Sequence, residues 1–307
     1  MIVTEPVLVI GFNRPELLAR VIASLREVQP KRLFIAIDGP RANHPEDHEK
    51  VQLCRSLVKQ INWDCAVTTL FHDSNLGCGL GVTTALSWFF SHVDRGIILE
   101  DDILPDPSFF GFCSELLDRY AEDERVFGIS GCNFVPRSQQ TYPDADYRFS
   151  RVAHIWGWAT WRRSWASYRF DLEGWLRMLP LQRLWVSSGK SITGSLFWAM
   201  TFELMARKHV DTWDAQLVFA AMRQGQFMAT ANTNLVENIG FGQDATHTLR
   251  AVEIETRGSI MLPTTPVPVQ VDERADAWTR RHHFHASIPG IAHQSLTFMG
   301  RKWRAAA

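Results

Sequence analysis

The residues with the clearest chemical potential are three consecutive carboxylates, Glu100, Asp101 and Asp102, in the segment RGIILEDDILPDPSFF. Adjacent carboxylates repel one another unless a cation or hydrogen-bond donors compensate their charge. Oxygen ligands favour Mg²⁺ or Mn²⁺ over zinc, and these ions keep positions open for water and for substrate phosphates. The triplet therefore predicts a hard divalent cation that helps to bind a nucleotide diphosphate. The alternative is a solvated turn in which Asp102 caps the next segment.

Polar residues also follow two other apolar runs. Asn13 and Arg14 come after PVLVIGF, and Asp38 closes KRLFIAIDGP. Since an aspartate only accepts hydrogen bonds, Asp38 can bind ribose hydroxyls or a base N–H; a simple Asx turn before Gly-Pro is the alternative. Asn75 lies in the loop SNLGCGLG, which matches neither the P-loop nor the dinucleotide fingerprint. The glycines of this loop are therefore weak evidence for a phosphate site.

The second half of the chain is rich in tryptophan, with ten of the twelve Trp after residue 150. HIWGWATWRRSW, residues 154–165, combines four Trp with two Arg, which could stack on a sugar ring and bind phosphate; an aromatic core segment is the alternative. Asp211 and Asp214 bracket Thr-Trp before a helix, so either could be an N-cap or a first-turn acid. His247, in NIGFGQDATHT, is a metal ligand, a phosphate donor or a surface histidine.

The elements that must position these residues alternate between strand and helix. Continuous apolar runs predict buried parallel strands near residues 6–12, 31–38, 65–72 and 95–100. Helices are expected directly after residue 13, where Asn13 and Glu16 resemble a capping box, and at residues 45–60, 83–93 and 214–224. This pattern predicts an α/β fold with a Rossmann-like, mostly parallel sheet flanked by helices. Because ligands bind outside the carboxyl ends of such strands, one crevice could hold Asn13, Asp38 and residues 100–102.

Composition excludes several classes of protein. The chain has 307 residues, 46% of them hydrophobic, and a formal charge of −1, as in ordinary globular proteins. Its five Cys contain no CxxC pair, so neither a disulfide framework nor a zinc site is indicated. Residues 1–150 hold 14 Lys/Arg against 21 Asp/Glu, and residues 151–307 hold 18 against 12. An acidic half suits cations and a basic half suits phosphates, but no motif indicates a nucleic-acid partner.

Two features bear on location. The first residues lack the basic region and cleavage site of a signal peptide, and residues 74–93 are too polar to span a membrane, so we expect a cytoplasmic protein. Residues 273–307 hold six Arg/Lys against two acids, with aromatic residues between them. This C-terminal extension, residues 251–307, is expected either to contact a membrane surface peripherally or to pack on the catalytic domain.

Together these segments resemble a known family. VIGFNRPELL, IAIDGP, IILEDDILPDPSFF, SGCNF, GWATW, TWDAQ and NIGFGQDATHT occur in the order found in GT-A glycosyltransferases, with the strongest similarity to the N-acetylglucosaminyltransferase I group and its bacterial relatives. The resemblance spans roughly residues 6–250. It implies a single GT-A domain over residues 1–250, with a nucleotide-sugar-binding half (1–103) and an acceptor-binding half (104–250).

The resemblance also implies roles for individual residues. Asp102 would bind Mn²⁺ or Mg²⁺, and Asp214 of Thr-Trp-Asp would be the catalytic base. The family's late Ser-His pair aligns with Thr246 and His247, which makes His247 a second metal ligand. The residues expected to bind the donor are Asn13, Arg14, Asp38, Asn75, Glu100 and Asp101. Those expected to bind the acceptor or sugar are Gly157, Trp158, Trp161 and Asn133.

The function that follows is a metal-dependent inverting glycosyltransferase. It would move a sugar from a nucleotide-diphosphate donor, expected to be a UDP-sugar, to a hydroxyl of a glycan or other acceptor in surface polysaccharide synthesis. A nucleotidyltransferase would want a glycine-rich loop with Arg or Lys directly after the first strand, and GFNRP supplies no such glycines. The alternative from another class is a non-catalytic nucleotide- or carbohydrate-binding protein on a decayed GT-A scaffold.

Overall fold

The computed structural model describes residues 3–240, 256–262, 265–287 and 289–290. Its main feature is an eight-stranded sheet in the order β3-β2-β1-β4-β8-β6-β9-β7. Six strands point the same way, and β8 and β7 run against them, which confirms the α/β fold with a mostly parallel sheet. The strands are β1 (Val7–Gly11), β2 (Arg32–Ile37), β3 (Ala66–Phe71), β4 (Arg95–Glu100), β6 (Val126–Ser130), β7 (Tyr147–Ser150), β8 (Trp158–Trp161) and β9 (Phe227–Ala231).

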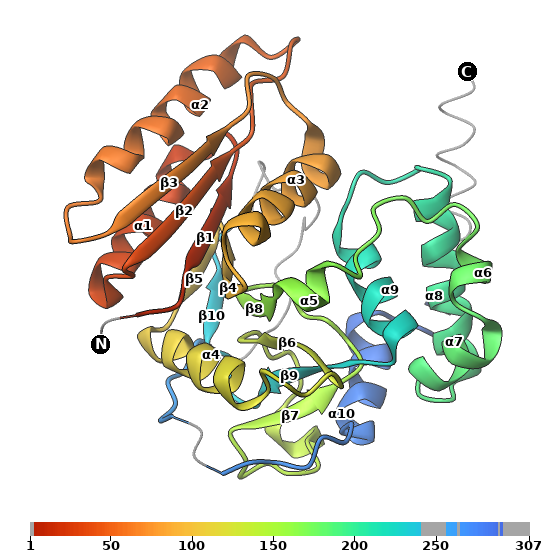
Figure 1. Ribbon diagram of the computed structural model, residues 1–307. Coiled ribbons are helices and arrows are strands. Elements are labelled where there is room, and N and C mark those ends of the chain that lie inside the picture. The colour runs from red at the N-terminus through yellow and green to blue at the C-terminus, as the bar shows by residue number, and fades with distance from the viewer. Residues whose placement is uncertain (1–2, 241–255, 263–264, 288, 291–307) are drawn as a thin grey trace.

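Helices cover both faces of this sheet (Figure 1). Along β1, Val7 and Val9 join the core beneath one set of helices, while Leu8 and Ile10 join the core on the opposite face. A strand buried on both faces reads as a continuous apolar run, which is why VLVIG could be recognised from sequence. The first face carries α1 (Pro15–Val28), α2 (Pro45–Ser56) and α4 (Pro107–Arg119), and the second carries α3 (Gly77–His92) and α9 (Asp214–Gln224).

Two helix starts differ from the sequence expectation. The N-cap of α1 is Arg14, without a side-chain cap, because the amide of Asn13 donates to Asp47 Oδ1 at 2.7 Å instead; the predicted capping box is wrong. Helix α3 begins at Gly77 rather than at residue 83, so the glycine-rich loop supplies its first turn. The helix expected at 45–60 comprises α2 and the 3₁₀ turn η1 (Leu57–Gln60).

The second half adds a small helical layer on α9. Leu184, Trp198 and Phe202 pack with Val218 and Phe219 of α9 in a third apolar cluster. A second sheet pairs the two halves of the chain, because β5 directly after the carboxylate triplet runs antiparallel to β10. The remaining elements are α5 (Arg162–Trp165), α6 (Trp175–Met178), α7 (Leu181–Ser187), α8 (Ile192–Ala206), β5 (Ile103–Pro105), β10 (Val236–Asn238) and the 3₁₀ helix η2 (Arg137–Gln139).

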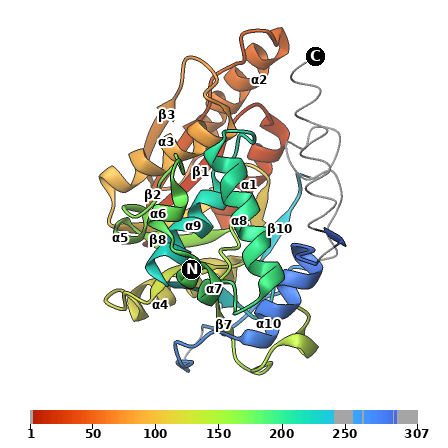
Figure 2. The same cartoon turned by 90° about the vertical axis from the view of Figure 1, so that its right-hand side faces the viewer.

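Part of the C-terminal extension packs on the sheet. Helix α10 (Glu273–Trp278) lies beside β7, and the π-helix η3 (Thr279–His283) follows it (Figure 2). The buried carboxylate of Asp276 accepts hydrogen bonds from Ser150 Oγ at 2.6 Å and from the Arg151 amide at 3.0 Å. For these residues the structure agrees with the packing alternative; residues 291–307 lie outside the described part. No helix in the described ranges is long and apolar enough to cross a membrane.

Two buried histidines in contact with each other, His154 and His283 of η3, are expected to make the free energy of unfolding depend on pH. Burial lowers the pKa of His154 well below its usual value and that of His283 to about 4. In the unfolded chain a histidine has a pKa near 6.5, so below that pH the unfolded chain takes up a proton that the folded chain does not. The stabilisation of the folded state by the neutral histidines is therefore complete above about pH 6.5 and is lost as the pH falls toward 4.

We therefore expect His283→Asn to flatten the pH dependence of unfolding. Between pH 7.5 and 5.5, the variant should lose about 1 kcal/mol less of its unfolding free energy than the parent protein. Urea unfolding at both pH values measures this difference. His48→Asn, a change on the exposed surface of α2, is the control and should behave as the parent. Equal slopes for His283→Asn and the parent would contradict the prediction.

Candidate functional site

The carboxylate triplet lies at the carboxyl end of β4, beside the loop that follows β1. Arg14 forms ion pairs with Asp101 and, at 3.0 Å, with Asp102. Asp101 is buried, and its Oδ2 also accepts the backbone N–H of Phe12 at 3.2 Å. Sequence analysis placed Arg14 and the triplet at one sheet edge, and the structure brings them together. Asp101 anchors the β1 loop, whereas the side chain of Asp102 is 14% exposed.

The electrostatics of the triplet favour a bound cation. Burial raises the pKa of Glu100, and the neighbouring charges of Asp102 and Asp101 raise it further. Burial also raises the pKa of Asp101, although Arg14 opposes that shift. Three carboxylates and one guanidinium leave a formal charge of −2 when all are ionised. A divalent ion would neutralise that remainder.

The donor set fits a cation that shares its coordination with a substrate. Among the described residues, no group of three or more His, Cys, Asp or Glu side chains could hold a metal ion. Mg²⁺ and Mn²⁺ sites that bind substrate phosphates need only one or two protein carboxylates. Asp102 Oδ2 bonds Arg14, and Oδ1 has no hydrogen-bond partner in the described part of the chain. Asp102 therefore fits as a single protein ligand.

Asp38, at the end of β2, joins this strand to helix α3. Its carboxylate accepts hydrogen bonds from Asn75 Nδ2 at 2.8 Å and from the Leu76 amide at 3.0 Å. Oδ1 also accepts the amide of Gly39, the next residue, at 2.9 Å, but the Asx turn proposed as the alternative to ligand binding needs the amide two residues on, which Pro40 lacks. Asp38 and Asn75, both expected to bind the donor, are thus bonded to each other. A ribose or base that binds Asp38 must therefore share its carboxylate oxygens with these protein donors.

Two residues beside Asn13 escaped sequence analysis. Asp47, fully buried in the first turn of α2, bonds Asn13 and also accepts from Arg41 Nε at 2.6 Å and Nη2 at 3.0 Å. The Arg41 guanidinium holds the pKa of Asp47 well below its usual range. The side chain of Arg41 is 42% exposed and stacks over Phe12. Asp47 therefore holds the Arg41 guanidinium next to the β1 loop. The sequence feature that could have revealed Asp47 is its place as an acid in the first turn of a helix.

Asp211 and Asp214 have different contacts. Asp211 accepts the amides of Cys78 at 2.9 Å and Gly79 at 2.8 Å, so it binds the N-terminus of α3 rather than that of α9. Asp214 is the first residue of α9, whose N-cap is Trp213, so neither aspartate is the N-cap and Asp214 is the first-turn acid. Asp214 Oδ1 accepts from Thr212 Oγ1 at 2.6 Å and from the Ala215 amide at 2.8 Å. Asp214 is exposed, and its Oδ2 makes no hydrogen bond within the described part of the chain.

Cys78 marks where the acids of the two halves meet. Burial raises the pKa of its thiol to about 12, and the charges of Glu100, Asp211 and Asp214 add to that shift. The charge of Asp214 also raises the pKa of Glu100. Carboxylates from β4 and from α9 therefore act on one small region at the start of α3. Sequence analysis did not single out Cys78.

Three of the expected acceptor residues lie elsewhere or are buried. Trp158 is 1% exposed and stacks on Trp213 inside the core. Trp161 pairs with Arg95 at the amino end of β4, the opposite edge of the sheet from the triplet. Asn133 is buried, and its amide donates to the carbonyls of Val135 and Asn232. These positions agree with the aromatic-core alternative for the two tryptophans, whereas ligand contact by the three residues stays a prediction.

Gly157, the fourth residue expected to bind the acceptor or sugar, lies at a bend of the backbone. Gly157 has a left-handed φ of +65°, and its carbonyl accepts the Gly131 amide at 2.9 Å. The backbone of Asp102 accepts the Ile239 amide at 2.8 Å, so the chain after β10 passes beside the triplet. Thr246 and His247 lie outside the described residues.

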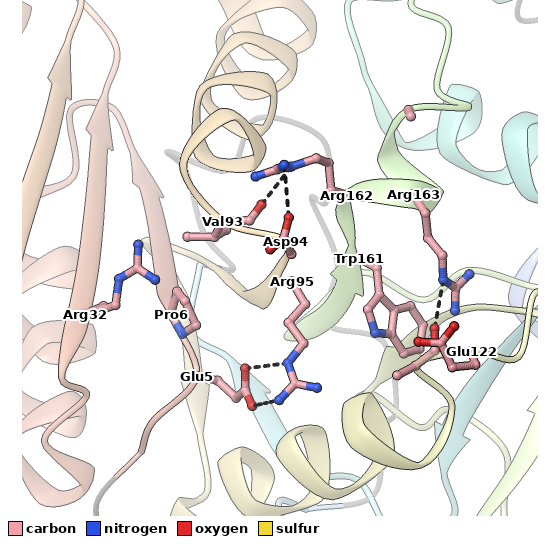
Figure 3. Close-up of a pocket in the computed structure, with 12 residues that line it drawn as sticks. Glu5, Pro6, Arg32, Val93, Asp94, Arg95, Glu122, Trp161, Arg162 and Arg163 are labelled. Carbon is pink, nitrogen blue, oxygen red and sulfur yellow. Dashed lines mark hydrogen bonds and ion pairs between the residues drawn. The ribbon is translucent and has the colours of Figure 1, made fainter.

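Two surface hollows lie away from the triplet. The larger, about 760 Å³, is at the amino edge of the sheet (Figure 3). Three of its four arginines are already engaged: Arg95 binds Glu5, Arg162 binds Asp94, and Arg163 donates to backbone carbonyls. The fourth, Arg32, lies over the ring of Phe34. The second, about 620 Å³, runs between α3 and residues 162–171. Neither hollow contains a carboxylate of the triplet.

Asp211→Ala tests the contact between the two halves. Removing the carboxylate leaves two amides of the first turn of α3 without their acceptor, so the free energy of unfolding should fall by about 0.5–2 kcal/mol. Urea denaturation measures this loss. Asp73→Ala is the matched control, because Asp73 is an exposed acid just before α3 whose side chain makes no hydrogen bond or ion pair with the described residues. If both variants are equally stable, Asp211 does not stabilise α3.

Comparison with known proteins identifies no family. No protein-family profile and no curated protein matches the chain. Among solved structures, the chain is similar to HddC from Yersinia pseudotuberculosis, with 10% identity, a TM-score of 0.31, and coverage of 52% of this chain and 78% of HddC. It is also similar to the inositol-1-phosphate CTP transferase from T. maritima, with 9% identity, a TM-score of 0.38, and coverage of 77% and 89%. TM-scores this low indicate no reaction.

Proposed function

We propose that the chain is a metal-dependent inverting glycosyltransferase that uses a nucleotide-diphosphate sugar. The observation that carries the proposal is the gathering of carboxylates from both halves around the start of α3. Glu100 and Asp102 come from the end of β4, and Asp214 comes from the start of α9. In open parallel sheets this carboxyl edge is the place where nucleotides bind. A single displacement reaction needs a group that binds the leaving diphosphate and a separate base. The carboxylate triplet, with a cation, would be the first, and the carboxylate from the other half would be the second.

The residues divide the work as follows. Asp102 would hold Mn²⁺ or Mg²⁺, with the positive charge of Arg14 paired to it and that of Arg41 held at the β1 loop by Asp47. The cation, when bound, stabilises the charge that develops on the leaving diphosphate. Asp214 accepts the proton of the acceptor hydroxyl as its oxygen bonds to the anomeric carbon and the bond from that carbon to the phosphate oxygen breaks. A single displacement of this kind inverts the anomeric centre.

The donor and acceptor classes come from the sequence resemblance and not from contacts in the structure. A UDP-sugar, specifically a UDP-N-acetylhexosamine, follows from the sequence resemblance, because Asp38 alone does not distinguish uracil from other bases. The acceptor is proposed to be a hydroxyl of a glycan in surface polysaccharide synthesis. Trp158 and Asn133, two of the residues on which acceptor binding is expected to depend, are buried.

A ligand panel tests the donor class. The melting temperature is measured with UDP, GDP, dTDP and CMP, each with and without Mn²⁺. Specific binding of a nucleoside diphosphate at 100 times its Kd should add about 2.7 kcal/mol of stability. We expect the largest shift with UDP and Mn²⁺ together. Selective stabilisation by GDP or dTDP would overturn the uridine assignment.

One observation favours a second candidate function. Arg14 already compensates part of the charge of Asp101 and Asp102, as a cation would. A non-catalytic nucleotide- or carbohydrate-binding protein could use that pair without a metal. Nucleotide binding that is the same in EDTA and in Mn²⁺, with no transfer to any acceptor, would favour this candidate.

A further inference from the structure

The outer faces of helices α6, α7 and α8 expose a set of large apolar side chains. Ile192 is 70% exposed and Leu181 is 68% exposed. Within α7 and α8 the exposed residues recur four positions apart, at 181 and 185 and at 192 and 196, so each pair lies on one side of its helix. The set, named here the apolar face, comprises Leu176, Leu181, Trp185, Val186, Ile192 and Leu196.

Packing inside the protein does not account for the apolar face. The same helices already bury a separate set of side chains, including Trp175, Leu184 and Trp198, against α9. Helices α6, α7 and α8 lie on the side of the molecule that faces the viewer in Figure 2. Soluble monomers seldom expose large neighbouring apolar residues without a partner. The apolar face is therefore a surface that another structure covers.

The charged residues around the apolar face indicate what kind of partner covers it. Residues 174–202 contain three basic residues, Arg177, Arg183 and Lys190, and no acid. No ion pair occupies these three in the described part of the chain. Of the flanking acids, Asp171 pairs with Lys208 at 3.6 Å and Glu203 with Arg207 at 2.6 Å, which leaves Glu173 as the one nearby acid of this segment without an ion pair in the described part of the chain. With three basic residues against this single unpaired acid, the segment that carries the apolar face has a net positive charge.

These two properties favour a membrane over a second copy of the chain. A two-fold dimer through the apolar face would bring the same basic residues of both copies together. Anionic lipid headgroups instead attract Lys and Arg, while Leu, Ile and Trp enter the boundary between headgroups and acyl chains. We propose that the outer face of α6–α8 docks on an anionic membrane surface. This surface differs from the C-terminal extension, part of which packs on β7.

Vesicle binding of the full chain tests the proposal. The protein is sedimented with phosphatidylcholine vesicles and with vesicles that contain phosphatidylglycerol. We expect binding only to the anionic vesicles, weakened by salt. The combined variant Leu181→Gln, Trp185→Gln, Ile192→Gln and Leu196→Gln should bind at least tenfold more weakly, and Arg177→Gln, Arg183→Gln and Lys190→Gln together should cost roughly 10²-fold. Because these side chains are exposed, melting temperatures should stay close to that of the parent.

Two controls make the result decisive. Leu53→Gln with Met261→Gln changes apolar residues exposed elsewhere and should leave vesicle binding unchanged. Light scattering gives the mass of the parent and of the apolar-face variant. Unaltered vesicle binding by that variant would overturn the proposal, as would a parent dimer that the variant converts to a monomer. Equal binding to neutral vesicles would overturn the role of anionic lipid.

Discussion

Asp214→Asn should lower glycosyl transfer by roughly 10²-fold or more while the melting temperature and donor binding stay near those of the parent. Asp214 is the first residue of α9 and uses Oδ1 for Thr212 and Ala215, which leaves Oδ2 toward solvent. An asparagine keeps the oxygen that bonds these two partners, so the local structure should persist. It lacks the second carboxylate oxygen, so it cannot take the proton of an acceptor hydroxyl.

The position of Asp214 matters more for this prediction than its basicity. The positive end of α9 favours a charged carboxylate, which lowers basicity. A sugar hydroxyl becomes acidic only as its oxygen bonds to the anomeric carbon, so an ionised carboxylate within hydrogen-bond reach is sufficient. Initial rates at saturating donor, paired with nucleotide binding measured by thermal shift, separate catalysis from binding.

Asp211→Asn is the matched comparison, because its carboxylate binds α3 and is not free to accept a substrate proton. We expect it to reduce stability more than rate. Full activity of Asp214→Asn would rule out the base assignment. Asp244, which lies outside the described residues, would then be the next acid to replace. Glu203 is a poor substitute, since it bonds Trp175 Nε1 and Arg207 on the helical layer.

How far the sequence predicts this molecule depends on the range of the interactions involved. The strands β1, β2 and β4 were predicted within one or two residues, because a strand covered on both faces must be apolar throughout. Strand β3 was also placed within one residue, but it lies at the edge of the sheet and is mostly exposed, so its expected burial is wrong. The start of α3 was missed by six residues. Its first turn is stabilised by Asp211, more than 130 residues later in the chain, and no local pattern contains that information.

The candidate site divides in the same way. Arg14 and the triplet could be placed together because the ends of neighbouring parallel strands meet at one edge. The contact of Asp47 with Asn13 joins two elements through a side chain, so it could not be read from spacing. Trp158 and Trp161 could not be placed from sequence because β8 runs antiparallel to β4, which carries Trp161 to the far edge and leaves Trp158 in the core. Strand direction is a tertiary property.

The second large effect is expected at Asp102, where activity and stability should change in opposite directions. Asp102→Asn should lower transfer by roughly 10²-fold or more, since a Lewis acid at the diphosphate contributes several kcal/mol to the transition state. The Mn²⁺-dependent part of the nucleotide thermal shift should disappear. Without ligand, however, the variant should be as stable as the parent or more so, because one of three mutually repelling carboxylates is gone.

Asp101→Asn provides the contrast for this test. Asp101 is buried and bonds both Arg14 and the Phe12 amide, so its replacement leaves a buried guanidinium less well compensated. Removing one partner of such a pair is expected to cost roughly 3 kcal/mol in unfolding free energy. A stable, inactive Asp102→Asn beside a destabilised Asp101→Asn would separate the residue that binds the cation from the residue that holds the β1 loop. Undiminished transfer by Asp102→Asn, in the presence of EDTA as well, would exclude the metal-dependent mechanism, and the ion pair with Arg14 would then be the only charge compensation that Asp102 needs.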